Sequence, residues 1–129
     1  MIKVNIFNEN QYQLDEQVLK TRVKKILNQY EIDDVSVDLS FVDTVKITQL
    51  NEEELHRQGQ TDVLSFPHYS AKDRKDFPLI GGKLLTLGDI VICYQTAEKE
   101  SIKFKNTLTD QICFYVEHGL LHLLGYHHY

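Results

Sequence analysis

Four histidines stand close together near the end of the chain, in the stretch HGLLHLLGYHH over residues 118–128. His118 and His122 are four residues apart, so on an α-helix they share one face, with Cβ atoms about 5–6 Å apart. Two imidazoles at this spacing can bind one metal ion, whereas a catalytic zinc ion usually takes three protein ligands and a water. The pair therefore predicts part of a metal site that needs a third donor.

The third donor predicted by the sequence is His128. If the helix ran on past Gly125, His128 would lie roughly 9 Å beyond His122 along the axis, too far to share one ion. Glycine tolerates the positive φ of a left-handed C-cap, so we expect the helix to end at Gly125 and His128 to fold back. Three imidazoles suit Zn²⁺ and would also accept nickel, copper or cobalt. The alternatives are hydrogen-bonded core histidines and a frayed tail.

The spacing of the histidines and the glycine matches the metzincin pattern HExxHxxGxxH. In metzincins the residue after the first histidine is the glutamate that acts as general base, but here that residue is Gly119. Glu117 cannot replace it, because neighbours in sequence point about 100° apart around a helix. A peptidase would therefore lack its base, and what remains is a metal ion that lowers the pKa of a bound water.

The motif HGLLHLLGYHH resembles the signature HGxLHLxGYDH of the YbeY family of bacterial endoribonucleases that mature ribosomal RNA. The resemblance extends through TDVLSFP (61–67), LGDIVI (87–92) with Thr96 and Ala97, and Leu50-Asn51. It implies that His118, His122 and His128 are ligands of one zinc ion in a zincin-like fold. It also implies maturation of small-subunit ribosomal RNA and ribosome quality control, with ribosomal RNA and the ribosome or its proteins as partners.

Two positions depart from the family pattern. The family's usual aspartate before the last histidine is His127 here. Three roles are open for His127: an exposed side chain, a competing metal ligand, or a residue that hydrogen-bonds to the ligands. The family's arginine, six residues before the threonine of TDVLSFP, is Leu55 here. Arg57 could reach the same cleft as a catalytic residue, since arginine suits a phosphodiester, or it could simply end a helix in solvent.

Two acidic residues near the expected cleft are further candidates. Asp62 could orient a ligand histidine through the free ring nitrogen of that histidine, or it could form a turn at the entrance of a strand. Asp89 is an acid inside an apolar strand, so it could be a general base or support a ligand. A hydrogen bond to backbone near Gly88 is the alternative for Asp89. Whether Ser65 faces the cleft or the core stays open.

The bulk composition bounds the class of protein. The 129 residues are 42% hydrophobic and 26% charged, which predicts a single domain over residues 1–129. No apolar run reaches about 18 residues and the first residues lack a secretory pattern, so we expect a cytoplasmic protein that does not enter a membrane. Cys93 and Cys113 are typical of buried thiols in a reducing compartment. With a net charge of −5, RNA binding would need a local basic patch.

Periodicity predicts the elements that position these residues. Strands are expected over residues 2–6, 35–41, 61–67 and 84–93, and the polar stretch 68–83 is expected to be a loop. Helices are expected over 14–30, from Asp43 or Thr44 to about Arg57, near Ala97 as a short piece, and over 108–124 after a Thr107 cap. The predicted fold is α+β, a mixed four-stranded sheet packed with helices and a C-terminal metal-binding helix.

Three functions remain in competition at this stage. A zinc-dependent endoribonuclease accounts for the histidines and the resemblance. A metal-stabilised factor that binds RNA or ribosomal protein without cutting is the alternative, and Leu55 in place of the arginine favours it. A metallopeptidase is the weakest hypothesis, because Gly119 stands where the base should be.

Overall fold

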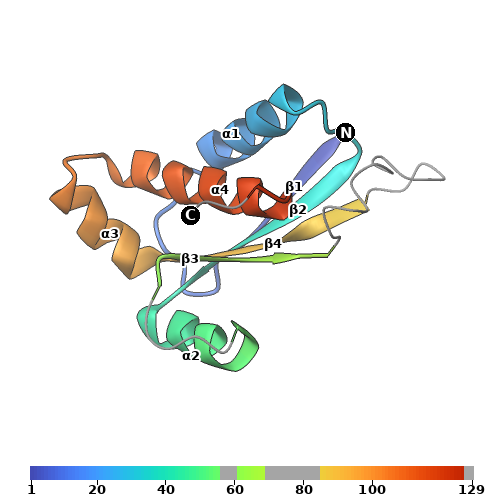
Figure 1. Cartoon of the computed structure of the whole chain (residues 1–129). Coiled ribbons are helices and arrows are strands. Elements are labelled where there is room, and N and C mark those ends of the chain that lie inside the picture. The colour runs from blue at the N-terminus through green and yellow to red at the C-terminus, as the bar shows by residue number, and fades with distance from the viewer. Residues whose placement is uncertain (56–60, 69–84, 127–129) are drawn as a thin grey trace.

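The structure is a computed structural model and describes residues 1–55, 61–68 and 85–126. Four strands and four helices follow one another along these ranges (Figure 1). In chain order they are β1 (Ile2–Phe7), α1 (Glu16–Gln29), β2 (Val35–Val42), α2 (Thr44–Leu55), β3 (Val63–Pro67), β4 (Leu85–Cys93), α3 (Tyr94–Lys103) and α4 (Leu108–Leu123).

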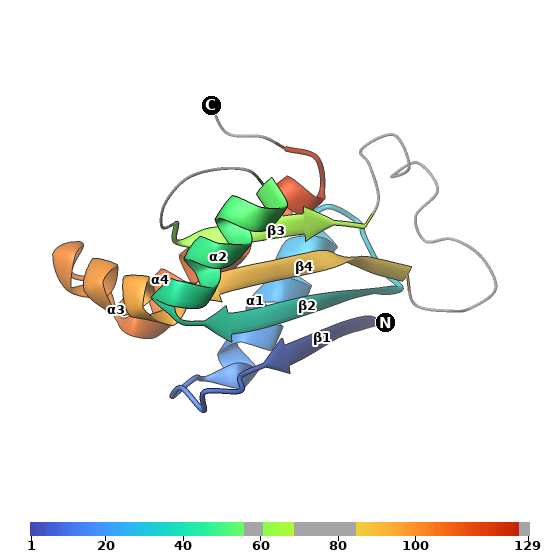
Figure 2. The same ribbon diagram turned by 90° about the horizontal axis from the view of Figure 1, so that it is seen from below.

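The strands form one mixed sheet in the order β1-β2-β4-β3, as Figure 2 shows. Strands β1, β2 and β4 are parallel, and β3 runs antiparallel to β4 at one edge. In the register of the sheet Leu39 of β2 and Ser65 of β3 both pair with Ile90 of β4. The prediction of an α+β fold with a mixed four-stranded sheet is confirmed.

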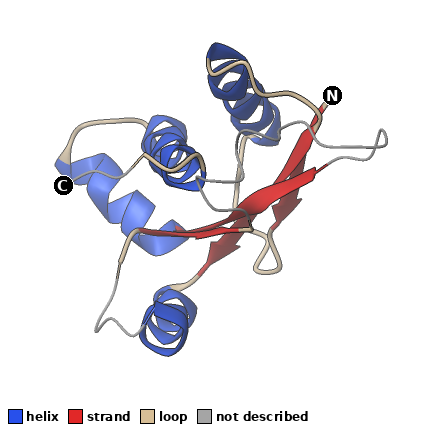
Figure 3. Ribbon diagram, turned by 45° about the vertical axis from the view of Figure 1, so that its right-hand side comes forward, coloured by secondary structure: helices blue, strands red, loops and turns tan. Residues whose placement is uncertain are grey.

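The sheet carries helices on both faces. Helices α1 and α4 lie against one face and α2 lies against the other (Figures 1 and 3). Because side chains alternate along a strand, β4 contributes Ile90 and Ile92 to the large core on the α4 side. Val91 and Cys93 join a smaller buried cluster with Ile47 of α2. Successive residues of β4 therefore pack alternately toward α4 and toward α2.

Capping side chains set where the helices begin. Asp15 accepts a hydrogen bond from the Val18 amide and starts α1, two residues later than the sequence predicted. Asp43 accepts from the Lys46 amide at 2.8 Å and starts α2. Thr107 accepts from the Asp110 amide at 3.1 Å, which confirms the predicted cap of α4. Helix α3 has ten residues, longer than the short piece expected near Ala97.

Helix α4 is the central helix of the fold, and its buried residues include Ile112, Cys113, Val116 and Leu120. Cys113 and Cys93 are buried free thiols, as the sequence predicted, and burial raises the pKa of the Cys113 thiol. Among the helices within the described ranges, none combines the length and the apolar character needed to cross a membrane.

Candidate active site

Helix α4 ends at the predicted glycine. The Gly125 amide donates to the carbonyl of His122 at 3.0 Å, and the Tyr126 amide donates to the carbonyl of Leu121 at 2.8 Å. These two bonds form a Schellman motif, which needs a residue in the left-handed region just past the helix. Gly125 has φ +90° and supplies it. The break that a returning ligand requires is therefore present.

His118 and His122 lie side by side on α4. Their ring centroids are 4.6 Å apart with 37° between the ring planes, and both side chains are half-buried. Both rings line a cavity of about 350 Å³, here called the histidine cavity. Its described lining consists of Leu55, Thr61, Asp62, Val63, Leu64, Ser65, Pro67, His118, Gly119 and His122. The histidine cavity thus lies between α4 and the edge strand β3.

Gly119 brings α4 close to the sheet. A Cβ atom at this position would lie 2.8 Å from Cγ2 and 3.1 Å from Cδ1 of Ile90, closer than van der Waals contact allows. Since Ser65 pairs with Ile90 across the sheet, this close approach carries the two histidines over β3. The position that holds the base in a metzincin is a packing contact here. Sequence reasoning noted the missing glutamate but missed this role; the only signal was one glycine inside an apolar helix.

Two predicted residues of β3 and its entrance share the cavity with the histidines. Asp62 lines it, and the Asp62 carbonyl accepts a hydrogen bond from the Cys93 amide at 2.9 Å. Ser65 also lines it and pairs with Ile90, whose side chain faces α4, so Ser65 points to the cleft side of the sheet. Asp62 and Ser65 therefore line the same cavity as the two imidazoles.

Asp89 lies elsewhere. It precedes Ile90, whose side chain contacts Gly119 of α4, so the side chain of Asp89 points to the opposite face of the sheet. There Oδ2 of Asp89 is 3.1 Å from Nε2 of His68. Asp89 is not among the described residues that line the histidine cavity. The structure does not bring this candidate base together with the predicted ligands.

The other predicted site residues, Arg57, His127 and His128, lie outside the described residues. Within the described ranges, no group of three histidine, cysteine, aspartate or glutamate side chains is arranged to hold a metal ion. His118 and His122 fit two positions of a zinc ligand set, because they are neighbouring imidazoles on one rigid helix face that opens into a cavity. Completing the set depends on a third donor, which the sequence predicts to be His128.

Comparison with known proteins bears on this arrangement. A family model described as "Endoribonuclease YbeY" matches residues 5–129. Proteins with the same description include one from Clostridioides difficile, 40% identical over 96 residues that make up 74% of this chain and 60% of that protein. Another, from Mycoplasma mycoides, is 32% identical over 134 residues, which cover 99% of this chain and 77% of the relative.

The match to a third relative, from Prochlorococcus marinus, is 37% identical over 94 residues and spans 73% of this chain but only 48% of that protein. The chain therefore spans about half the length of some curated relatives that it matches. A solution structure from Thermotoga maritima has the same fold, with a TM-score of 0.61 and 28% identity over 100% of this chain and 75% of that one. On the match of the family model over residues 5–129, the chain belongs to the YbeY family.

Proposed function

We propose that this protein is a zinc-dependent endoribonuclease that acts in the cytoplasm on small-subunit ribosomal RNA, in its maturation and in ribosome quality control. The observation that carries the proposal is the pair His118 and His122 on one face of α4, with ring centroids 4.6 Å apart and both rings lining one cavity. The pair is found in a chain of a family described by its endoribonuclease activity. Ribosomal RNA and ribosomal proteins are the proposed partners.

His118, His122 and His128 would hold the zinc ion, whose chemistry when bound would be to lower the pKa of a water and to polarise the scissile phosphate. Asp62 is suited to accept a hydrogen bond from the free ring N–H of a ligand histidine, which fixes its orientation. Ser65 offers a hydroxyl for a phosphate oxygen of the RNA. The contact of Gly119 with Ile90 keeps the helix that bears the imidazoles against the sheet.

The charge of the cavity supports a role for a metal ion. Its described lining contains the acidic Asp62 but neither lysine nor arginine. An RNA phosphate entering this space needs positive charge nearby, because the affinity of proteins for nucleic acid rests mostly on neutralising phosphates. We propose that the zinc ion and Arg57 supply it, with His127 behind the ligands.

A second candidate function rests on Leu55. This apolar side chain stands where the YbeY family has an arginine, and it lines the histidine cavity. A cavity that holds a metal but has lost its phosphate-binding arginine suits a factor that binds RNA or ribosomal protein without cleaving it. The feature that separates the two functions is whether bound RNA is cut.

The test measures metal content and RNA cleavage on the same preparations. Purified protein with one zinc per chain should cut structured ribosomal RNA, and His118→Ala and His122→Ala should each lose both the zinc and the cleavage. His68→Ala is the matched control, because His68 pairs with Asp89 on the opposite face of the sheet and should keep both. Cleavage that survives in the zinc-free His118→Ala protein would come from a contaminant and would overturn the proposal.

Further outcomes separate the alternatives. Zinc-loaded protein that binds the RNA without cutting it would establish the assembly factor. Loss of cutting with retained zinc in Arg57→Ala would place Arg57 at the phosphate. Hydrolysis of casein that depends on His122 would revive the peptidase.

A further inference from the structure

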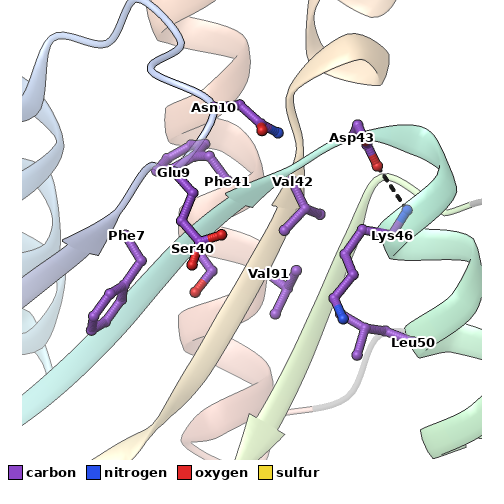
Figure 4. A pocket seen from close by; sticks show the side chains of 10 residues that line it. All are labelled: Phe7, Glu9, Asn10, Ser40, Phe41, Val42, Asp43, Lys46, Leu50 and Val91. Carbon is purple, nitrogen blue, oxygen red and sulfur yellow. Dashed lines mark hydrogen bonds between the residues drawn. The ribbon is translucent and has the colours of Figure 1, made fainter.

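A second cavity, of about 410 Å³, lies on the side of the sheet that faces α2, away from the histidine cavity. We call it the sheet cavity. Figure 4 shows Phe7, Glu9 and Asn10 on one wall, Lys46 and Leu50 of α2 on the other, and Val42 and Val91 between them. Ser40, Phe41 and Asp43 complete the described lining. No part of the function proposed above uses this cavity.

The place of the sheet cavity in the topology favours a ligand. Strands β1 and β2 are parallel neighbours, and the cavity lies where they end, at Phe7 and Val42. After β1 the chain passes to α1 on one face of the sheet, and after β2 it passes to α2 on the other (Figure 3). This divergence is a topological switch point, where open α/β sheets form the crevice in which ligands bind.

The lining combines apolar and acidic groups. Val42, Val91 and Leu50 offer an apolar surface, and Phe7 at the rim is 52% exposed. The carboxylates are those of Glu9, which is exposed, and of Asp43, at the start of α2. A cavity of this size, which combines an apolar surface with polar and charged side chains, is within the range of sites for small organic molecules.

Anions are poor candidates for this cavity, although a helix begins there. The Asp43 carboxylate already accepts from the Lys46 amide at 2.8 Å, and the Thr44 amide donates to Oε1 of Gln95 at 2.9 Å. The Thr44 and Lys46 amides of the first turn are thus engaged, and the Asp43 carboxylate places a negative charge where a phosphate would otherwise bind. The lining has two carboxylates, those of Glu9 and Asp43, against the single ammonium group of Lys46, so its net charge favours a cation.

We propose that the sheet cavity binds a small organic cation, an ammonium or guanidinium group carried on an apolar body. The cation pairs with Glu9 and Asp43, and the apolar body lies on Val42 and Val91. The Lys46 side chain runs along the opposite wall beside Leu50 (Figure 4), so it directs the positive end of the ligand toward Glu9. The site does not depend on the zinc chemistry, because it lies across the sheet from the histidines.

Three probes of one shape and different charge test the proposal: phenylpropylamine, phenylpropanol and phenylpropanoate. Binding is followed by NMR of the valine methyl groups and by calorimetry. We expect the amine to shift the methyl signals of Val42 and Val91 and to bind about tenfold more tightly than the alcohol, with the carboxylate weakest. Glu9→Gln and Asp43→Asn should each weaken the amine about five- to tenfold, and asparagine still caps a helix.

Glu53→Gln is the matched control, since Glu53 is an exposed acid of α2 outside the lining and should leave binding unchanged. Equal affinity for the three probes, or amine binding that is insensitive to Glu9 and Asp43, would refute the proposal. Methyl shifts confined to Val63, which lines the histidine cavity, would place the ligand there and refute the proposal as well. Binding of arginine- or lysine-containing peptides or of RNA, with no binding of the amine, would overturn the assignment to a small molecule.

Discussion

Replacing Gly119 by alanine should change the stability of the fold in two opposite ways, through helix propensity and through crowding against Ile90. In an isolated helix the change stabilises, because alanine exceeds glycine in helix propensity by about 1 kcal/mol. In this fold the added Cβ would meet Ile90 at 2.8 Å from Cγ2 and 3.1 Å from both Cγ1 and Cδ1. Ile90 is 0% exposed, so it cannot relieve the contact by moving into solvent.

Overpacking of a buried contact typically costs about 1–3 kcal/mol. Setting the gain in helix propensity against the middle of that range leaves a net loss of about 1 kcal/mol in the free energy of unfolding. Urea denaturation should therefore show a lower midpoint for Gly119→Ala with an unchanged slope, because the surface exposed on unfolding stays the same.

The Ile90→Ala background provides the control. It removes all three crowding atoms, at a cost of its own of about 2–5 kcal/mol. In that background Gly119→Ala should no longer destabilise, which gives a coupling free energy of at least about 1 kcal/mol between the two positions. If Gly119→Ala alone raised the urea midpoint, helix propensity would be the dominant effect and the close approach of α4 to β4 would be refuted.

Three further changes test the ends and the core of α4. Gly125→Ala should lower the free energy of unfolding by about 1–2 kcal/mol in urea titrations, because alanine is strained at φ +90°; an unchanged midpoint would argue against the Schellman turn. Thr107→Ala should lose about 1 kcal/mol and Thr107→Ser almost none, since serine caps equally well. Burial raises the pKa of Tyr115 from 10.0 to about 12, so its contribution to stability is complete below about pH 10 and is lost as pH rises toward 12. In Tyr115→Phe the unfolding midpoint should therefore depend less steeply on pH over that range. An equally steep decline in the variant would assign the pH dependence to other groups.

Local chemistry made much of the fold predictable from the sequence. Alternating apolar residues predicted the first two strands, because a sheet buries one side chain in two on a given face. The other two strands were predicted as more buried stretches, the last of them rich in β-branched residues. The ends of α4 were predicted because single residues determine them, with the Thr107 hydroxyl at the start and the positive φ of Gly125 at the end. Neither feature depends on distant parts of the chain.

Helix α3 was less predictable, because its buried face lacks large aliphatic residues. Its buried residues are Tyr94, Thr96, Ala97 and Ser101, three of them with hydroxyl groups. It begins directly after β4 with Cys93 at the cap position, and the Cys93 side chain caps no backbone amide of the helix. Without an apolar stripe or a capping side chain, its length is defined by packing against α4, α2 and β4.

The candidate site was only partly predictable, because the sequence does not show which face of the sheet α4 covers. Alternation alone says that Asp89 and Ile90 point to opposite sides, but it cannot say which side α4 covers. The close contact of Gly119 with Ile90 decides this. Because α4 covers the face that carries Ile90, Ser65, the cross-strand partner of Ile90, lines the histidine cavity. Asp89 points to the opposite face.

The packing of α4 on one face of the sheet also leaves several carboxylates on the other face. Asp89 is paired across the strands with Asp38 of β2, so both carboxylates belong to the face that also carries Ser40 and the sheet cavity. Their negative charge adds to that of Glu9 on this side. The histidines, with the metal proposed for them, lie on the other side. A phosphate backbone and an organic cation should therefore prefer opposite faces of one thin sheet, so the two proposed sites can be occupied together.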